Sequence, residues 1–126
     1  MSITPPRSVG ALVVVGALCL QALIVYAPQV PGPEPAVPGT DKIVHGIVFA
    51  LPVVLAGVAR LPWWRWLAVA LAVHAPVSEL IQQTMLPDRS GDPLDVLADL
   101  VGVGLAVLWV EWWVRRPGRR HPRSSH

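Results

Sequence analysis

The chain has 126 residues, of which 53% are hydrophobic and only 14% are charged, and its formal net charge is +2. A soluble domain carries about 25% charged residues, so this composition and a mean hydropathy of +0.53 indicate an integral membrane protein. The same composition argues against a nucleic-acid-binding protein, although arginines crowd the C-terminus from Arg115 to Arg123. The single Cys19 allows no internal disulfide, so it says nothing about the redox compartment.

Four apolar segments follow one another along residues 9–114, and we predict that each one crosses a bilayer. The first is long for a secretory signal and no small-x-small cleavage site follows it, so we expect it to remain uncleaved. The predicted spans are at about 9–27, 43–59, 67–82 and 94–114, between a short N-terminus at 1–8 and a basic tail at 115–126.

The connections carry recognisable helix signals. Residues 28–40 are rich in proline, which predicts a stiff loop outside the bilayer, after which Thr40 or Asp41 can cap the second span. Pro52 interrupts that span, and the carbonyl group that it leaves free must find another partner. Asp92 followed by Pro93 predicts the start of the last helix, with Asp92 as its N-cap.

The arginines predict the orientation. Arg7, the Arg60–Arg65 connection and the C-terminal arginines alternate with connections almost empty of Lys and Arg, and four spans place all three basic regions on one side. By the positive-inside rule that side is the cytoplasm, and all six tryptophans fall at the same ends of the spans. We therefore predict an all-α integral membrane bundle of four transmembrane helices with both termini cytoplasmic.

Nearly every unusual polar residue then falls in the outer leaflet or at its surface. Lys42 and His45 share one face of the second span, while Asp92, Asp95 and Asp99 follow the three-and-four spacing of one helix face. We predict that these groups face one another across the bundle. The candidate ligand-binding residues are Lys42, His45, Glu79, Gln82, Arg89, Asp95 and Asp99, and the candidate structural residues are Asp41, Asp92 and Gly102.

Single members of this set also have structural interpretations. Asp95 can complement the helix dipole, Gly102 can be a packing glycine, and Asp99 or Glu79 can form an ion pair with Lys42 or Arg89. However, desolvation offsets much of what buried ion pairs contribute, so a cluster held only by pairing stabilises a small bundle poorly. The set as a whole favours a binding site.

Three chemistries are compatible with the site. The first is binding of a lipid headgroup or lipid-linked cell-wall group, with Lys42 and Arg89 on an anion and Glu79, Gln82, Asp95 and Asp99 orienting them or contacting the ligand. The second is a divalent metal site of His45, Glu79, Asp95 and Asp99, for which no HExxH-like pair is present. The third is carboxylate-based hydrolysis or transfer, but no nucleophile has an adjacent base, so no catalytic residue is assigned. Among these chemistries binding ranks first, metal second and catalysis third, and a structural or partner-binding membrane subunit is a further alternative. No cofactor is predicted, and whether the protein is an enzyme stays open.

The residues from Asp41 to Gly102 resemble the VanZ-like family of small bacterial membrane proteins. DKIVHGIVFALPVVL is similar to the family's Asp-Lys-x-x-His opening, and SELIQQTMLPDRSGDPLDVLADLVG is similar to its Glu-x-x-Gln, Pro-x-Arg and Asp motifs, with an Asn and a Gly further on. The matching residues are Asp41, Lys42, His45, Glu79, Gln82, Arg89, Asp95 and Gly102. Asp99 stands where the family commonly has Asn, and the spacing from Gln82 to Arg89 is one residue longer.

This resemblance implies a multi-pass protein of the bacterial inner membrane. The residues of the site, taken by themselves, make a membrane lipid or lipid-linked envelope component the expected partner. The family takes its name from a protein associated with resistance to the glycopeptide teicoplanin, by a mechanism that is not established. Most members have no assigned activity, so the link to antibiotic resistance is a family-level expectation. Neither the ligand nor the oligomeric state follows from the residues.

Overall fold

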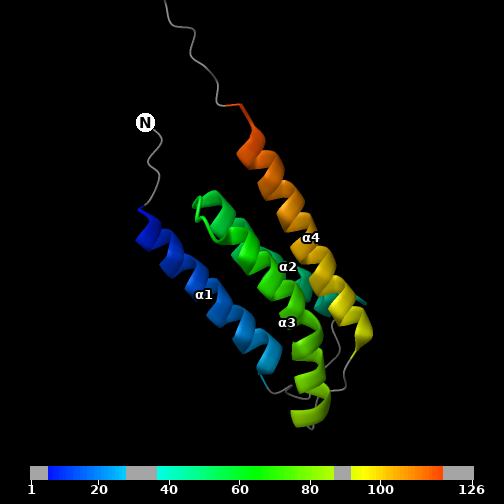
Figure 1. The fold of residues 1–126 in the computed structure, drawn as a ribbon. Coiled ribbons are helices and arrows are strands. Elements are labelled where there is room, and N and C mark those ends of the chain that lie inside the picture. The colour runs from blue at the N-terminus through cyan, green and yellow to red at the C-terminus, as the bar shows by residue number, and fades with distance from the viewer. Residues whose placement is uncertain (1–5, 28–36, 87–91, 118–126) are drawn as a thin grey trace, which may run out of the picture.

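In a computed structural model, which describes residues 6–27, 37–86 and 92–117, the chain is all-α (Figure 1). This confirms the all-α part of the predicted fold class, and each predicted span coincides with one helix to within three residues at either end. The predicted proline-rich connection lies largely outside the described residues, as does Arg89. The helices are α1 (Arg7–Tyr26), α2 (Thr40–Val58), α3 (Trp64–Met85) and α4 (Pro93–Arg115).

Three of the described helices, α1, α2 and α4, are long and apolar enough to cross a membrane. They contain 20, 19 and 23 residues, and about 20 residues span a bilayer core. The 22-residue α3 is more polar, because it carries Arg65, His74 and Glu79. The helices thus support a multi-pass membrane protein.

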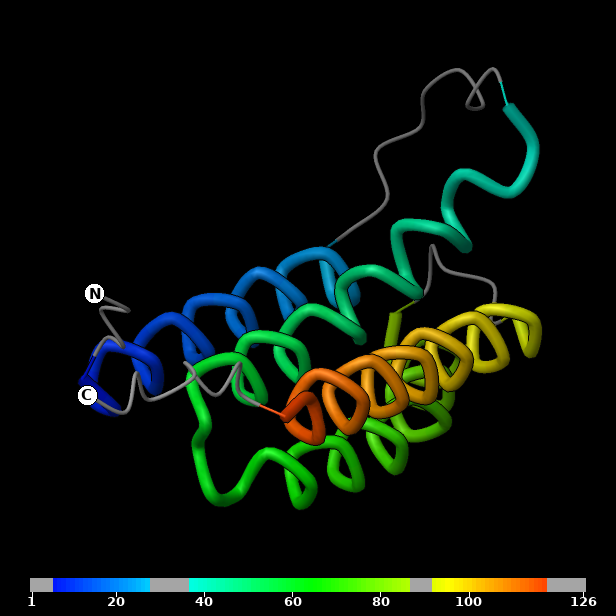
Figure 2. Tube along the Cα trace, turned by 90° about the horizontal axis from the view of Figure 1, so that it is seen from above, coloured from blue at the N-terminus to red at the C-terminus, as the bar shows by residue number. Residues whose placement is uncertain are grey.

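Successive helices run in opposite directions, so α2 and α4 are parallel to each other and antiparallel to α1 and α3 (Figure 1). The start of α1, the α2–α3 turn and the end of α4 therefore lie at one end of the bundle, which we call the arginine end. The end of α1 and the starts of α2 and α4 lie at the opposite end. Helix α2 packs against each of the other three helices, and the view from above shows α1 and α4 on different sides of it (Figure 2).

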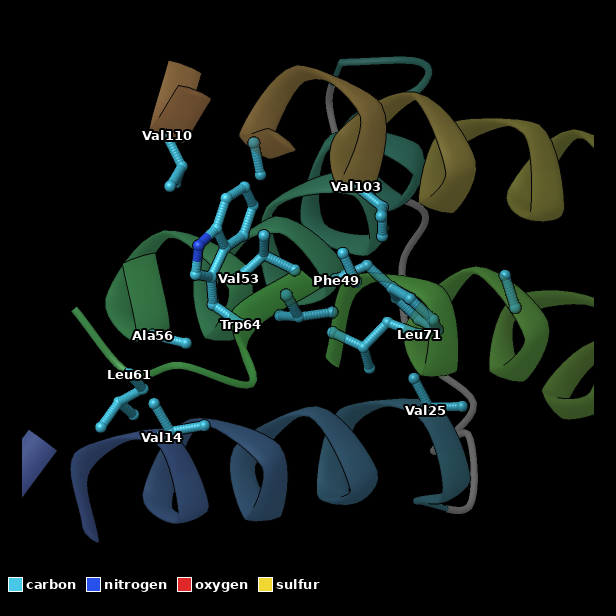
Figure 3. Close-up of a cluster of buried hydrophobic side chains, with 14 residues drawn as sticks. Val14, Val25, Phe49, Val53, Ala56, Leu61, Trp64, Leu71, Val103 and Val110 are labelled. Atoms are coloured by element: carbon cyan, nitrogen blue, oxygen red, sulfur yellow. The ribbon is translucent and has the colours of Figure 1, made fainter. Parts of the chain in front are cut away.

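The apolar core lies between the four helices. Phe49 and Val53 of α2 are fully buried and lie among Leu71 of α3 and Val103 of α4, while Trp64 closes the core toward the arginine end (Figure 3). Between helices in lipid, such packing stabilises the bundle through van der Waals contacts rather than through removal of apolar surface from water. These residues hold α2, α3 and α4 together beneath the polar groups at the opposite end.

Helices α2 and α4 share the most extensive helix–helix interface, in which one glycine lets the two backbones meet and another makes room for a side chain. A Cβ atom on Gly102 would clash with the Gly46 carbonyl oxygen, and one on Gly57 would clash with the Val110 side chain. Close approach at small residues is how helices associate in lipid. The suggested packing role of Gly102 agrees with its position.

Two side-chain amides form hydrogen bonds between α1 and the other helices. Pro52 has no N–H, which leaves the Val48 carbonyl without its usual helical donor, and Gln21 Nε2 donates to that oxygen at 3.4 Å. The expected partner for the freed carbonyl is therefore Gln21, a buried residue within the apolar α1. Gln82 Nε2 donates to the carbonyl oxygen of Val25 at 2.7 Å, in the last turn of α1, where carbonyls lack helical donors.

The helix starts agree with the sequence at α4 and differ at α2. Asp92 is the N-cap of α4 as predicted, and its side chain accepts the Leu94 N–H at 2.9 Å. The prediction that Thr40 or Asp41 caps α2 is wrong, because Gly39 is the N-cap, with φ of 85°. Only glycine adopts this conformation readily, and the Thr40 hydroxyl instead donates back to the Val37 carbonyl at 2.7 Å.

Candidate binding site at the carboxylate cluster

Six of the predicted polar residues converge at the end of the bundle opposite the arginine end. Four of them, Lys42, His45, Asp95 and Asp99, are linked by contacts between α2 and α4, and Asp92 joins them at the start of α4. Glu79 comes from α3. We call this set the carboxylate cluster: Lys42, His45, Glu79, Asp92, Asp95 and Asp99.

Lys42, in the first turn of α2, is surrounded by carboxylates. Its Nζ lies 2.9 Å from Asp92 Oδ2, 3.4 Å from Asp95 Oδ1 and 3.5 Å from Asp41 Oδ2. The hydrogen bond from Lys42, followed by the bond from the Leu94 backbone N–H, lowers the pKa of Asp92 below its ordinary value. The ammonium group is therefore already occupied by three neighbours.

One turn deeper, His45 lies between two aspartates of α4. Its Nδ1 is 3.2 Å from Asp99 Oδ1, and its Nε2 is 4.0 Å from Asp95 Oδ2. Asp99 is only 2% exposed, so the imidazole is the polar neighbour that offsets the burial of its carboxyl group. The three-and-four spacing correctly predicted that His45, Asp95 and Asp99 meet.

Glu79 brings a carboxylate with an open acceptor atom to the cluster. The residue is 7% exposed, its carboxylate accepts a hydrogen bond from the Asp92 backbone N–H, and Asp95 and His45 are within electrostatic range. Its Oε1 atom is buried and has no hydrogen-bond partner among the described residues. Leaving a buried acceptor unsatisfied costs about 1–3 kcal/mol, and more for a charged group, so this atom is suited to a donor from outside the chain.

A second set of polar residues, to which the sequence analysis gave no role, lies on the α1 side of the bundle. The Tyr26 hydroxyl lies 2.7 Å from His74 Nε2, and the His74 ring stacks on Phe49 with centroids 5.7 Å apart. His74 is within electrostatic range of Asp99. Tyr26 is the only tyrosine of the chain and ends α1 at the level of the polar layer, which is the signal that the sequence offered.

Gln82, another predicted ligand-binding residue, makes its described hydrogen bond outside the cluster. The Gln82 amide donates to the Val25 carbonyl and so joins α3 to α1. Arg89 lies outside the described residues. The described contacts thus supply the cluster with carboxylates, one lysine and one histidine.

The described residues contain no group of three or more His, Cys, Asp or Glu side chains arranged to hold a metal ion. The alternative metal-binding set of the sequence analysis is therefore not arranged around a common point, and its members are His45, Glu79, Asp95 and Asp99. The nearby Ser78 hydroxyl donates to the Ala75 carbonyl at 2.8 Å, as serines within helices commonly do. The geometry offers hydrogen-bond acceptors more readily than metal ligands or a nucleophile.

Charge is segregated between the two ends of the described bundle. The cluster end holds Lys42 and five acidic residues, a formal excess of four negative charges when all five are ionised and His45 is neutral, and the five are Asp41, Glu79, Asp92, Asp95 and Asp99. At the arginine end Glu111 faces five arginines, an excess of four positive charges, and they are Arg7, Arg60, Arg65, Arg115 and Arg116. The cluster therefore attracts cations.

An apolar groove of about 590 Å³ begins at Lys42 and runs between α2 and α4 toward Trp109. Small residues such as Gly46, Ala50 and Ala98 form part of its lining, which makes room for an aliphatic chain. The carboxylate cluster is polar and the groove that begins beside it is apolar. Together they are complementary to an amphiphile, because the cluster matches a polar group and the groove matches a hydrocarbon chain.

Comparison of the chain with protein-family models, with curated proteins and with solved structures found no match.

Proposed function

We propose that this chain is a VanZ-like protein of the bacterial inner membrane in which all four helices cross the bilayer. The positive-inside rule places the arginine end, and with it both termini, in the cytoplasm. The tryptophans of that end are of the kind that concentrates at the headgroup level. In α3 the polar Ser78, Glu79 and Gln82 are buried against other helices, which is how polar residues are accommodated within a bilayer.

The carboxylate cluster then lies at the outer leaflet and binds the polar group of a membrane lipid or lipid-linked cell-wall precursor. The observation that carries this function is the buried Glu79 Oε1, which belongs to a carboxylate within electrostatic range of Asp95 and His45 and has no hydrogen-bond partner among residues 6–27, 37–86 and 92–117. A family-level link to teicoplanin resistance would follow from binding an envelope component of this kind.

The group that fits the cluster is a protonated amine. Lys42 already contacts three carboxylates, so it is poorly placed to bind the anion that the sequence suggested. An ammonium group carries three donors and no acceptor, and therefore matches Glu79 and the neighbouring aspartates in both charge and hydrogen bonding. Aminated headgroups and peptide amines share this chemistry, and the groove between α2 and α4 receives the attached chain.

The test is native mass spectrometry of the full chain released from bacterial membranes in mild detergent. We compare the wild type with Glu79→Gln, which replaces one carboxylate oxygen with a donor, and with Gln83→Ala, an exposed site four residues further along α3. We expect the wild type and Gln83→Ala to retain an amine-bearing lipid or precursor, identified by its mass, and Glu79→Gln to lose it.

Either of two results would contradict the proposal. Equal retention by all three proteins would show that Glu79 does not contact the ligand. A bare wild-type protein that also fails to take up phosphatidylethanolamine in lipid nanodiscs would exclude an amine headgroup site. A third result would contradict the amine alone. If the wild type retains a ligand without an amine and Glu79→Gln loses it, Glu79 is part of a binding site whose ligand is not an amine.

A further inference from the structure

The α2–α3 turn at the arginine end contains a residue that the fold alone does not favour. The Arg60 N–H donates to Gly57 O and the Leu61 N–H donates to Ala56 O, each at 3.0 Å. These two bonds form a Schellman motif, in which the position of Arg60 is usually occupied by glycine. Arg60 has φ of 54° and is the only non-glycine residue with positive φ in the described part of the chain.

Glycine would make this turn with less backbone strain, so the Arg60 side chain has to be explained by something other than the turn. A strained position points to function only when its surroundings do so as well. Here the surroundings are a pocket and an excess of positive charge.

A pocket of about 280 Å³ lies at this turn. Arg60 and Arg65 line it together with Gly57, Trp64 and Val114, so it combines guanidinium groups with apolar surface. The groove between α2 and α4 lies elsewhere, and none of its lining residues is shared with this pocket.

The two arginines of the pocket differ in their partners. Arg65 Nη2 and Nε lie 2.7 and 2.9 Å from Glu111 Oε1, and Arg115 Nε lies 3.3 Å from Glu111 Oε2. The Arg60 guanidinium lies 5.0 Å from the centre of the Trp113 ring and forms no ion pair with a carboxylate among the described residues. Glu111 thus neutralises part of the charge of its two neighbours, and Arg60 keeps donors for an anion.

We propose that this pocket binds the phosphate of an anionic membrane lipid, with Arg60 as the principal ligand and Arg65 beside it. A guanidinium group matches phosphate with two parallel hydrogen bonds, and it does so while stacked on an aromatic ring. The exposed Trp66 and Trp112 at the same end are residues of the headgroup level, which identifies the source of the phosphate as a lipid. This site lies at the opposite end from the carboxylate cluster and does not depend on it.

The experiment measures tryptophan quenching by brominated lipids in nanodiscs containing the full chain. All six tryptophans belong to the segments that form the arginine end, and only Trp109 also lines the groove between α2 and α4, so quenching of the other five reports on this end. Brominated phosphatidylglycerol is compared with brominated phosphatidylcholine, both as minor components in phosphatidylcholine. We expect the wild type to prefer phosphatidylglycerol.

Two matched lysine variants separate a specific phosphate site from diffuse attraction. Arg60→Lys keeps the charge and removes the two-pronged hydrogen bonding, and should lower the preference about tenfold. Arg116→Lys makes the same change at an exposed arginine outside the pocket, and should leave the preference unchanged. If the two variants give the same preference, the attraction is diffuse and the proposal is wrong.

Arg60→Gly shows whether a loss of lipid preference comes from the missing side chain or from a misfolded protein. Glycine suits the backbone of the turn, so this variant should unfold at the same temperature as the wild type or higher, while losing the lipid preference. A folded Arg60→Gly protein with wild-type preference would overturn the site. A lower unfolding temperature would show instead that the arginine side chain supports the fold through Trp113.

Discussion

Gln21 of α1 donates its side-chain amide to the Val48 carbonyl, 3.4 Å away, at the point where Pro52 interrupts the hydrogen bonding of α2. The pair couples two helices through a backbone group that one of them leaves unsatisfied. It predicts that the cost of losing Gln21 depends on Pro52.

We expect Gln21→Leu to lower the free energy of unfolding by about 1 kcal/mol, since Val48 O is left without a donor. In a Pro52→Ala background the backbone N–H of the introduced alanine can supply that donor, so the cost should fall toward zero. The measurement is a double-mutant cycle followed by denaturation with SDS in mixed micelles. Equal costs in both backgrounds would contradict the coupling.

Gly102 and Gly104 give a matched test of the α2–α4 crossing. Gly102→Ala puts a Cβ atom against the Gly46 carbonyl, whereas a Cβ on Gly104 meets nothing within 4 Å. We expect Gly102→Ala to cost about 1–3 kcal/mol, as overpacking does, and Gly104→Ala to be neutral or slightly stabilising. Both are measured by the same denaturation, and equal effects would show that the backbones do not meet at Gly102.

The bond between Lys42 and Asp92 predicts a pH dependence at the start of α4. Because Lys42 and the Leu94 N–H lower the pKa of folded Asp92 below its ordinary value of 3.8, the bond stabilises the fold above that value. The stabilisation is lost as the pH falls through the lower, folded-state pKa. The unfolding temperature of the wild type should therefore exceed that of Asp92→Asn at neutral pH, and the gap should close in acid. A gap that stays constant as the pH falls would exclude this linkage.

Two substitutions of Asp99 distinguish its contribution to folding from its contribution to ligand binding. Asp99→Asn keeps an oxygen acceptor for His45 Nδ1 and should change the free energy of unfolding little, while Asp99→Leu removes the acceptor and should cost about 1–3 kcal/mol. The asparagine variant also removes a negative charge, so retention of an amine ligand in native mass spectra should fall about tenfold. Unchanged ligand retention in Asp99→Asn would show that the charge of Asp99 does not contribute to binding.

The sequence predicted the helices and the convergence of the carboxylates because both follow from local spacing. His45 meets Asp99 since each occupies a regular position on one helix face, and Asp92 caps α4 since Pro93 follows it. The freed Val48 carbonyl was also predictable, because its cause is the single residue Pro52.

The remaining features depend on how the helices pack, which spacing does not encode. Gln82 follows Glu79 on the same face, yet its amide reaches the end of α1. The neutralisation of Lys42 by three carboxylates depends on the parallel arrangement of α2 and α4. The positive φ of Arg60 could not be predicted, because a turn of this kind is recognised in a sequence by a glycine at that position.

The carboxylate cluster combines residues of a closely packed helix pair with one residue of a third helix. Four of its members belong to α2 and α4, whose backbones meet at Gly46 and Gly102, and they are Lys42, His45, Asp95 and Asp99. Glu79 belongs to α3, three residues after Pro76, which removes one backbone hydrogen bond of that helix and favours a bend there. A swing of the end of α3 about this proline would open or close the cluster while the geometry between His45 and Asp99 stays the same.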